Sequence, residues 1–139
     1  MTSTEKESDT MIRVKRIYES LAPSPDDGRR ILVDRLWPRG VSRHEAMLDE
    51  WMKDISPSSE LRRWFGHDPA RWQEFKKRYR QELEGKQPLF EKLKNEAEQG
   101  NITLLYAARD TQHNNAVALK EFLTEAGSSG AARRSRPRE

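Results

Sequence analysis

The sequence predicts a single α/β domain in which a small, mainly parallel sheet is flanked by helices. Two short apolar segments, 30–34 and 102–107, have the pattern of buried strands, and helical segments separate them. Helices that alternate with buried strands imply crossover connections, which parallel strands require. The length of 139 residues fits one domain that buries a core of its own.

The first part of the chain is expected to hold two strands joined by turns. Residues 1–10 are polar and are predicted to be a disordered N-terminal tail. Residues 12–17 alternate apolar and basic side chains, which is typical of a half-buried strand. The turn-rich segment 22–28 precedes the strand at 30–34. The segment 47–55 is compatible with a helix or an irregular strand, and both interpretations stay open.

Helices are expected to follow. A short helix is predicted to begin at Pro57 with Ser56 as its cap. A longer helix is predicted to begin at Pro69, with Asp68 as its cap. Its apolar residues fall on one stripe, formed by Trp72, Phe75, Tyr79 and Leu83.

The remaining elements are a helix, a strand and a last helix. The first of these helices starts near Pro88 and stops at Gly100. After the strand at 102–107, the last helix is predicted to run from about Gln112 to Ala126, with Gly127 as its stop signal.

Charge is distributed unevenly along the chain. The predicted domain spans 11–126 and is followed by a flexible basic tail at 127–139. The tail holds four arginines and one glutamate, which account for the whole net charge of +3. Because the rest of the chain is neutral, nucleic-acid binding is not expected, except weakly through the tail.

Several classes of site are excluded by composition. The absence of cysteine excludes disulfides, thiol nucleophiles and Cys-ligated metals. His44, His67 and His113 share no ligand spacing, so no metal site is predicted, although Asp34, Asp110 and His113 can meet in space. The sequence specifies neither a cofactor nor an oligomeric state. No apolar segment reaches the length of a membrane span, and no signal peptide is evident, so we predict a cytoplasmic protein without a membrane partner.

The turns that follow the two buried strands hold the candidate site, because ligands of open α/β sheets bind beyond the carboxyl ends of strands. Planar guanidinium groups meet carboxylate or phosphate oxygens in pairs. We therefore expect an anionic small molecule to be bound. The predicted ligand-binding residues are Arg35, Trp37, Arg39, Arg109 and Asn114.

Proton transfer is assigned to Asp34, Asp110 and His113. Structural roles are the alternative for each of these residues. Asp34 can pair with another charge, Asp110 or Thr111 can cap the last helix, and His113 can be a surface residue. Trp37 can likewise be a packing residue.

These segments resemble the short, YeaO-like branch of the DUF488 proteins. The resemblance covers about residues 11–125 and is carried by Asp34-Arg35-Leu36-Trp37-Pro38-Arg39-Gly40, by Leu61-Arg62-Arg63-Trp64-Phe65-Gly66-His67-Asp68-Pro69 and by Leu104-Leu105-Tyr106-Ala107-Ala108-Arg109-Asp110. It implies a small bacterial or archaeal α/β protein and brings no catalytic residues with it.

Three functions remain open at this point. The first is an enzyme or ligand-binding domain for an anionic metabolite, whether phosphorylated or not. The second is a non-catalytic protein that binds a partner through Trp51, Trp64 and Trp72. The third is a nucleic-acid-associated protein that uses the tail and the basic face of 12–17.

Overall fold

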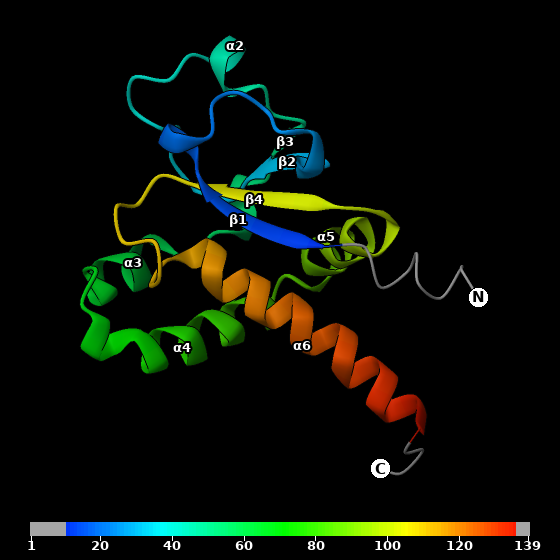
Figure 1. Ribbon diagram of the computed structural model, residues 1–139. Coiled ribbons are helices and arrows are strands. Elements are labelled where there is room, and N and C mark those ends of the chain that lie inside the picture. The colour runs from blue at the N-terminus through cyan, green and yellow to red at the C-terminus, as the bar shows by residue number, and fades with distance from the viewer. Residues whose placement is uncertain (1–10, 136–139) are drawn as a thin grey trace.

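The computed structural model describes the backbone of residues 11–135 and the side chains of residues 11–126. One four-stranded sheet with the strand order β1-β4-β2-β3 forms its centre, and every neighbouring pair is parallel. The strands are β1 (Ile12–Arg16), β2 (Arg29–Leu32), β3 (Glu50–Trp51) and β4 (Ile102–Tyr106). The predicted α/β class, with a single domain and a small parallel sheet, is confirmed (Figure 1).

The strand β4 lies in the middle of the sheet, as its uninterrupted apolar sequence requires. All five of its residues are buried. It pairs with β1 on one side and β2 on the other, so that Ile102 lies opposite both Ile12 and Arg29. The edge strand β1 keeps its alternating side chains half-buried. The carboxyl ends of β2 and β4 therefore lie next to each other.

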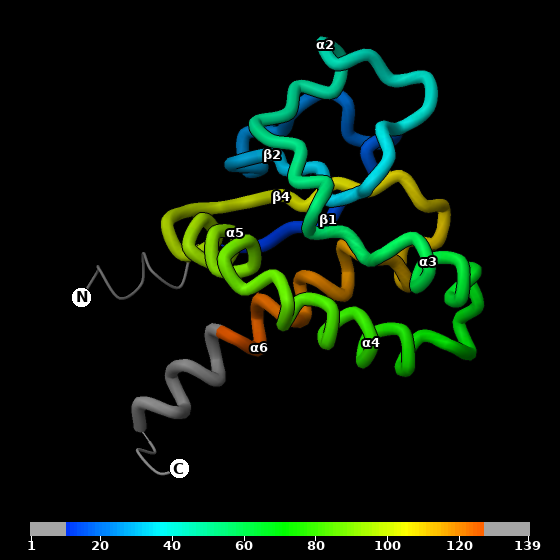
Figure 2. The backbone as a smooth tube through the Cα atoms, turned by 180° about the vertical axis from the view of Figure 1, so that it is seen from behind, coloured from blue at the N-terminus to red at the C-terminus, as the bar shows by residue number. Residues whose placement is uncertain are grey.

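Four helices cover one face of the sheet (Figures 1 and 2). They are α3 (Ser59–Phe65), α4 (Trp72–Glu84), α5 (Gln87–Gln99) and α6 (Asn115–Ser135). The predicted apolar stripe of α4 is buried and packs in one core with Leu104 and Tyr106 of β4. Asp68 caps the turn η4 (Pro69–Arg71) that leads into α4 by accepting a hydrogen bond from the Ala70 amide.

The opposite face of the sheet packs against irregular chain. The segment 33–49, which includes the short helix α2 (Arg43–Ala46), crosses this face together with the turns η1 (Ile17–Glu19) and η2 (Pro25–Asp27). A second, smaller core forms here from Ile17, Leu32, Val41, Ala46 and Leu105. The irregular segment 33–49 is thus packed onto the sheet.

The structure decides between the two interpretations of 47–55 and corrects one predicted cap. The segment forms the two-residue strand β3 and the turn η3 (Lys53–Ile55), which agrees with the irregular strand and not with a helix. Ser58, not Ser56, caps α3 by accepting a hydrogen bond from the Leu61 amide. Ser56 is engaged elsewhere, because its hydroxyl donates to the Lys53 carbonyl at 2.6 Å.

The last helix differs at both ends from its predicted bounds. Asn114 caps its start, since its Oδ1 accepts a hydrogen bond from the Val117 amide, and α6 then continues to Ser135. The predicted stop at Gly127 is therefore wrong. A glycine weakens a helix by only about 1 kcal/mol and does not have to end it. The predicted N-terminal tail, 1–10, lies outside the described residues.

Candidate functional site

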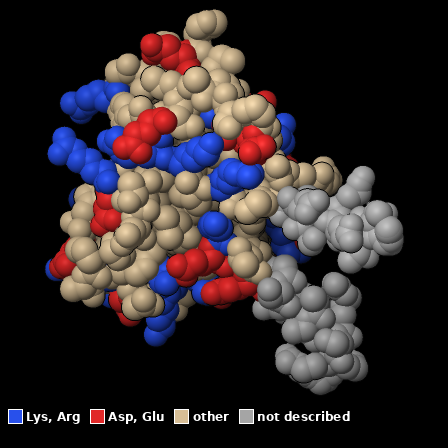
Figure 3. Space-filling view, in the orientation of Figure 1, with Lys and Arg blue, Asp and Glu red and all other residues tan. Residues whose placement is uncertain are grey.

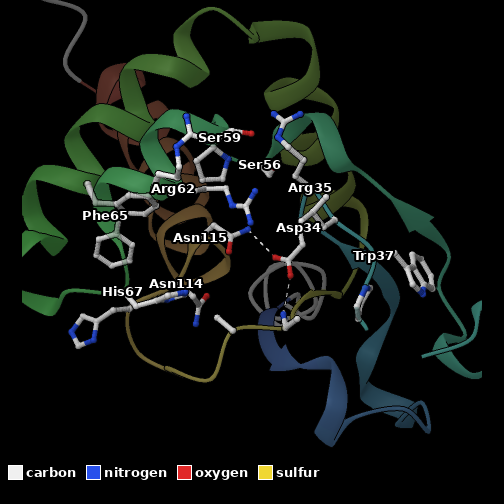
Figure 4. Close-up of a pocket in the computed structure, with 18 of the residues that line it drawn as sticks. Asp34, Arg35, Trp37, Ser56, Ser59, Arg62, Phe65, His67, Asn114 and Asn115 are labelled. Atoms are coloured by element: carbon white, nitrogen blue, oxygen red, sulfur yellow. Dashed lines mark hydrogen bonds between the residues drawn. The ribbon is translucent and has the colours of Figure 1, made fainter. Parts of the chain in front are cut away.

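A pocket of about 740 Å³ lies where β2 and β4 end (Figure 4). Three segments form its walls: the turn 34–39 after β2, the helix α3 with the residues around it, and the turn 107–115 before α6. The parallel sheet brings the first and third segments together, and the crossover between them supplies α3. The pocket thus combines side chains that lie far apart in the sequence.

Asp34 joins these walls at the floor of the pocket. Its Oδ2 accepts a hydrogen bond from the Ala107 amide at 2.9 Å, and its Oδ1 accepts one from Asn115 Nδ2 at 3.2 Å. Burial raises the pKa of Asp34, although these two donors and the charge of Arg62 act in the opposite direction. Both carboxylate oxygens therefore tie the end of β2 to the end of β4 and the start of α6.

Four arginines line the pocket, and together they dominate its charge. Arg35 and Arg39 come from the turn after β2, and Arg62 and Arg63 come from α3. Among the residues that the structure describes, none of the four lies within 4.0 Å of a carboxylate oxygen in a salt bridge. Arg35 also has a buried Nε atom without a hydrogen-bond partner.

Several arginines outside the pocket are paired with carboxylates. Arg29 pairs with both Glu50 and Glu96, at 3.2 and 3.3 Å, and Arg80 pairs with Glu125 at 2.8 Å. The positive charge of the pocket also affects a lysine, Lys86, that lies near it but does not line it. Burial and the nearby Arg35 guanidinium lower the pKa of Lys86. The pocket is thus a concentration of positive charge that the protein itself leaves largely unbalanced.

Trp37 lines the pocket and is fixed in place from behind. Its Nε1 donates to the Val41 carbonyl at 2.6 Å, and its ring meets Trp51 edge-on at a centroid distance of 5.2 Å. Arg43 lies over both rings. Trp51 does not line the pocket, but its Nε1 donates to the Asp34 carbonyl at 2.8 Å. The two tryptophans thus stabilise the turn that carries Arg35 and Asp34.

The turn after β4 separates the other predicted site residues into two groups. His113 and Asn114 line the pocket, whereas Arg109 and Asp110 line a neighbouring cavity of about 630 Å³. Asn114 is buried, and its Nδ2 donates to the Asp110 carbonyl. Only part of the predicted set is therefore brought together in one pocket.

Asp110 organises this turn. Its Oδ1 accepts hydrogen bonds from the Gln112 and His113 amides, at 2.9 and 3.0 Å, and its Oδ2 lies 3.0 Å from His113 Nδ1. The Gln112 amide and the contacts with His113 hold the pKa of Asp110 below its usual value. A carboxylate that orients a histidine ring in this way is a common arrangement in general acid–base catalysis.

Four lining residues were missed by reasoning from the sequence. Arg62 and Arg63 lie on α3, and Asn115 lies one residue beyond the predicted set. His67 lines both cavities and has a φ of 57°. The adjacent arginine pair was the one signal in the sequence that pointed to α3.

The two other functions that the sequence left open find less structural support. Trp72 is buried, and Trp51 and Trp64 are half-buried, so these rings form no exposed aromatic patch. On the face that carries β1 and α6, basic and acidic side chains are interspersed (Figure 3). The basic residues of β1 have acidic partners, in the pairs Arg13–Asp26, Lys15–Asp27 and Arg16–Glu19.

Among the described side chains, those of residues 11–126, no group of three or more His, Cys, Asp or Glu is arranged to hold a metal ion. No helix in this part of the chain is long and apolar enough to cross a membrane.

Comparison with known proteins places the chain in a family. The model of DUF488-N3i, the inactive DUF488-N3 subclade, matches residues 11–138. The uncharacterized protein YeaO of Escherichia coli is 41% identical over 112 residues, which cover 81% of this chain and 96% of that protein. The uncharacterized protein Mb3100c of Mycobacterium bovis is 39% identical over 115 residues, or 83% of this chain and 95% of that protein. No solved structure matches the chain. The chain belongs to the DUF488 family, among its YeaO-like members.

Proposed function

We propose that this protein is a non-catalytic binding domain for a small anionic ligand that carries phosphate or several carboxylate groups. The observation that carries the proposal is the set of four arginines in one pocket without salt-bridge partners among the described residues. Guanidinium groups in one cavity repel one another, and an anion with two or more charges relieves that repulsion. Each charge-assisted hydrogen bond to such an anion contributes about 1.5–3 kcal/mol.

The chemistry of the individual side chains fits a ligand with several oxygen atoms. Arg35 offers the buried Nε that lacks a partner, and a planar guanidinium binds a phosphate or carboxylate through two parallel hydrogen bonds. Trp37 supplies a rigid apolar wall beside these donors. A few convergent polar groups beside apolar walls are the usual composition of a small-molecule site.

Binding without turnover is favoured for two reasons. The matching family model is described as an inactive subclade. In addition, both oxygens of Asp34, the one carboxylate among the pocket's lining residues, are occupied by Ala107 and Asn115. Asp34 is thereby assigned a structural role, in which it holds the strand ends together.

The second candidate is an enzyme that uses His113 as a general acid or base. The observation that favours it is the 3.0 Å contact between His113 Nδ1 and Asp110, which leaves the other ring nitrogen available beside the pocket. Incubation with a ligand of the pocket and detection of product by phosphorus NMR distinguishes the two candidates. If the wild-type protein converts the ligand and His113→Gln abolishes this turnover, the protein is an enzyme and the binding proposal is wrong.

Titration calorimetry with phosphate, pyrophosphate and citrate tests the binding proposal. Arg62→Ala is expected to weaken the binding of these anions by about tenfold or more, because it removes one charged partner. Lys77→Ala is the matched control, since Lys77 is exposed on α4 and does not line the pocket; it should change affinity by less than about twofold. Absence of binding by the wild-type protein, or equal losses in both variants, would overturn the proposal.

A further inference from the structure

The pocket borders a neighbouring cavity, which the proposed function does not use. That second cavity measures about 630 Å³ and shares His67, Ala107 and Ala108 with the pocket of four arginines. Each cavity alone falls in the size range of a small-molecule site. The two are therefore neighbouring compartments separated by a common boundary.

The residues at the end of β4 that line both compartments have small side chains. Ala107 and Ala108 carry only methyl groups, and they follow the bulky, buried residues of that strand. His67 is the third residue that lines both compartments. An uncharged stretch of ligand fits over two methyl groups, whereas a charged group does not gain from them.

The second compartment has cationic side chains of its own. Arg109 is exposed and forms no salt bridge among the described residues. Arg16 donates from Nε to the Ala108 carbonyl at 2.9 Å and stacks on Tyr18, with its outer end 3.7 Å from Glu19. The acidic residue in the lining, Asp110, is already engaged by the amides and the ring described above.

A hydrogen bond couples the walls of the two compartments. The hydroxyl of Tyr18, in the second compartment, donates to the carbonyl of Arg39, in the first, at 2.8 Å. This hydrogen bond connects the turn that carries Arg35 and Arg39 to the lining of the second compartment. A ligand that spans both compartments would therefore contact residues that are held together.

We propose that the ligand is an elongated organic molecule with two separated anionic groups, such as a bisphosphate with its phosphates at opposite ends. The proposal rests on the proposed function and narrows it. One anionic group lies among the four arginines, the other lies at Arg109, and the uncharged middle crosses Ala107 and Ala108. A molecule anchored at both ends gains affinity because its second contact is intramolecular.

Titration calorimetry measures the affinity of the protein for a series of linear alkanediol bisphosphates with spacers of two to eight carbons. This test does not assume a natural ligand. Butyl phosphate is the single-ended reference. Affinity is expected to peak at an intermediate spacer length and to exceed that of butyl phosphate by about tenfold or more. Arg109→Ala should remove this gain and leave butyl phosphate binding within about twofold, whereas Lys77→Ala should leave both unchanged.

A blocking variant checks the path between the compartments. Ala108→Leu is expected to weaken the best bisphosphate by a larger factor than butyl phosphate, because only the bisphosphate crosses this residue, and circular dichroism verifies that the variant is folded. Equal affinity of all bisphosphates and butyl phosphate for the wild-type protein would overturn the two-ended ligand but not the anion site. If neither kind of probe binds, the proposed function itself fails.

Discussion

Acidification should weaken the fold through Asp27, which is 1% exposed beneath the sheet. Burial alone would raise the pKa of this carboxylate. Hydrogen bonds from Lys15 at 2.6 Å, from the Ser24 amide at 3.0 Å and from Arg30 at 2.7 Å outweigh burial and lower the pKa from 3.8 to about 2. The folded protein therefore binds the Asp27 proton less readily than the unfolded chain does.

The magnitude follows from that difference in pKa. At about 1.4 kcal/mol per pH unit, ionised Asp27 contributes about 2 kcal/mol to the free energy of unfolding. Because the pKa in the folded state is the lower one, this contribution is fully present above pH 3.8 and is lost as the pH falls to about 2. Urea unfolding followed by tryptophan fluorescence over this range measures the loss.

Asp27→Asn isolates the effect from that of other carboxyl groups. The variant should be about 3–5 kcal/mol less stable at neutral pH, since Arg30 is 2% exposed and loses its charged partner. Its deficit relative to wild type should shrink by about 2 kcal/mol between pH 3.8 and 2. The neighbouring, exposed Asp26→Asn serves as the control and should show no such convergence. A constant deficit across this range would refute the reasoning.

Four further substitutions test local packing and capping, each by urea unfolding. Gly28→Ala should lower the free energy of unfolding by more than about 3 kcal/mol, because φ is +64° and the added Cβ would lie 1.9 Å from a backbone oxygen. Gly40→Ala, where φ is +79° and the space is open, should lower it by only about 1–2 kcal/mol. Similar losses in the two variants would contradict the predicted clash. Tyr79→Phe should cost about 1–3 kcal/mol, since the buried Ile55 carbonyl loses a 2.7 Å hydrogen bond, and an unchanged midpoint would exclude that role. Ser58→Ala should cost about 1 kcal/mol by removing the cap of α3, and a gain in stability would contradict it.

The sequence was sufficient to predict three of the four strands and the edge at which the pocket lies. Apolar runs that stop at charged turns mark buried parallel strands, which assigns the turns after β2 and β4 to one edge of the sheet. The stripe on α4 was equally predictable, because four large apolar residues at helical spacing have few other uses.

The composition of the pocket was harder to predict. The arginines of α3 look the same in the sequence whether they face solvent or a cavity, since hydrophobic periodicity reports only the buried side of a helix. Arg109 was expected beside Arg35 because both follow buried strands. It lies in the neighbouring cavity instead, since which side a turn residue faces depends on the backbone of that turn.

The central place of β4 has a consequence for how the protein is made. The strands β1 and β2 do not pair with each other; each pairs with β4, so residue 12 meets residue 102. Such distant pairing is slow to form. Until the ribosome has made most of the chain, β1 has no partner, and β2 can pair only with the two-residue strand β3. Until then the apolar side chains of β2 are exposed to aggregation and to chaperones. Nascent chains truncated before residue 102 should therefore lack the four-stranded sheet and the pocket at its edge.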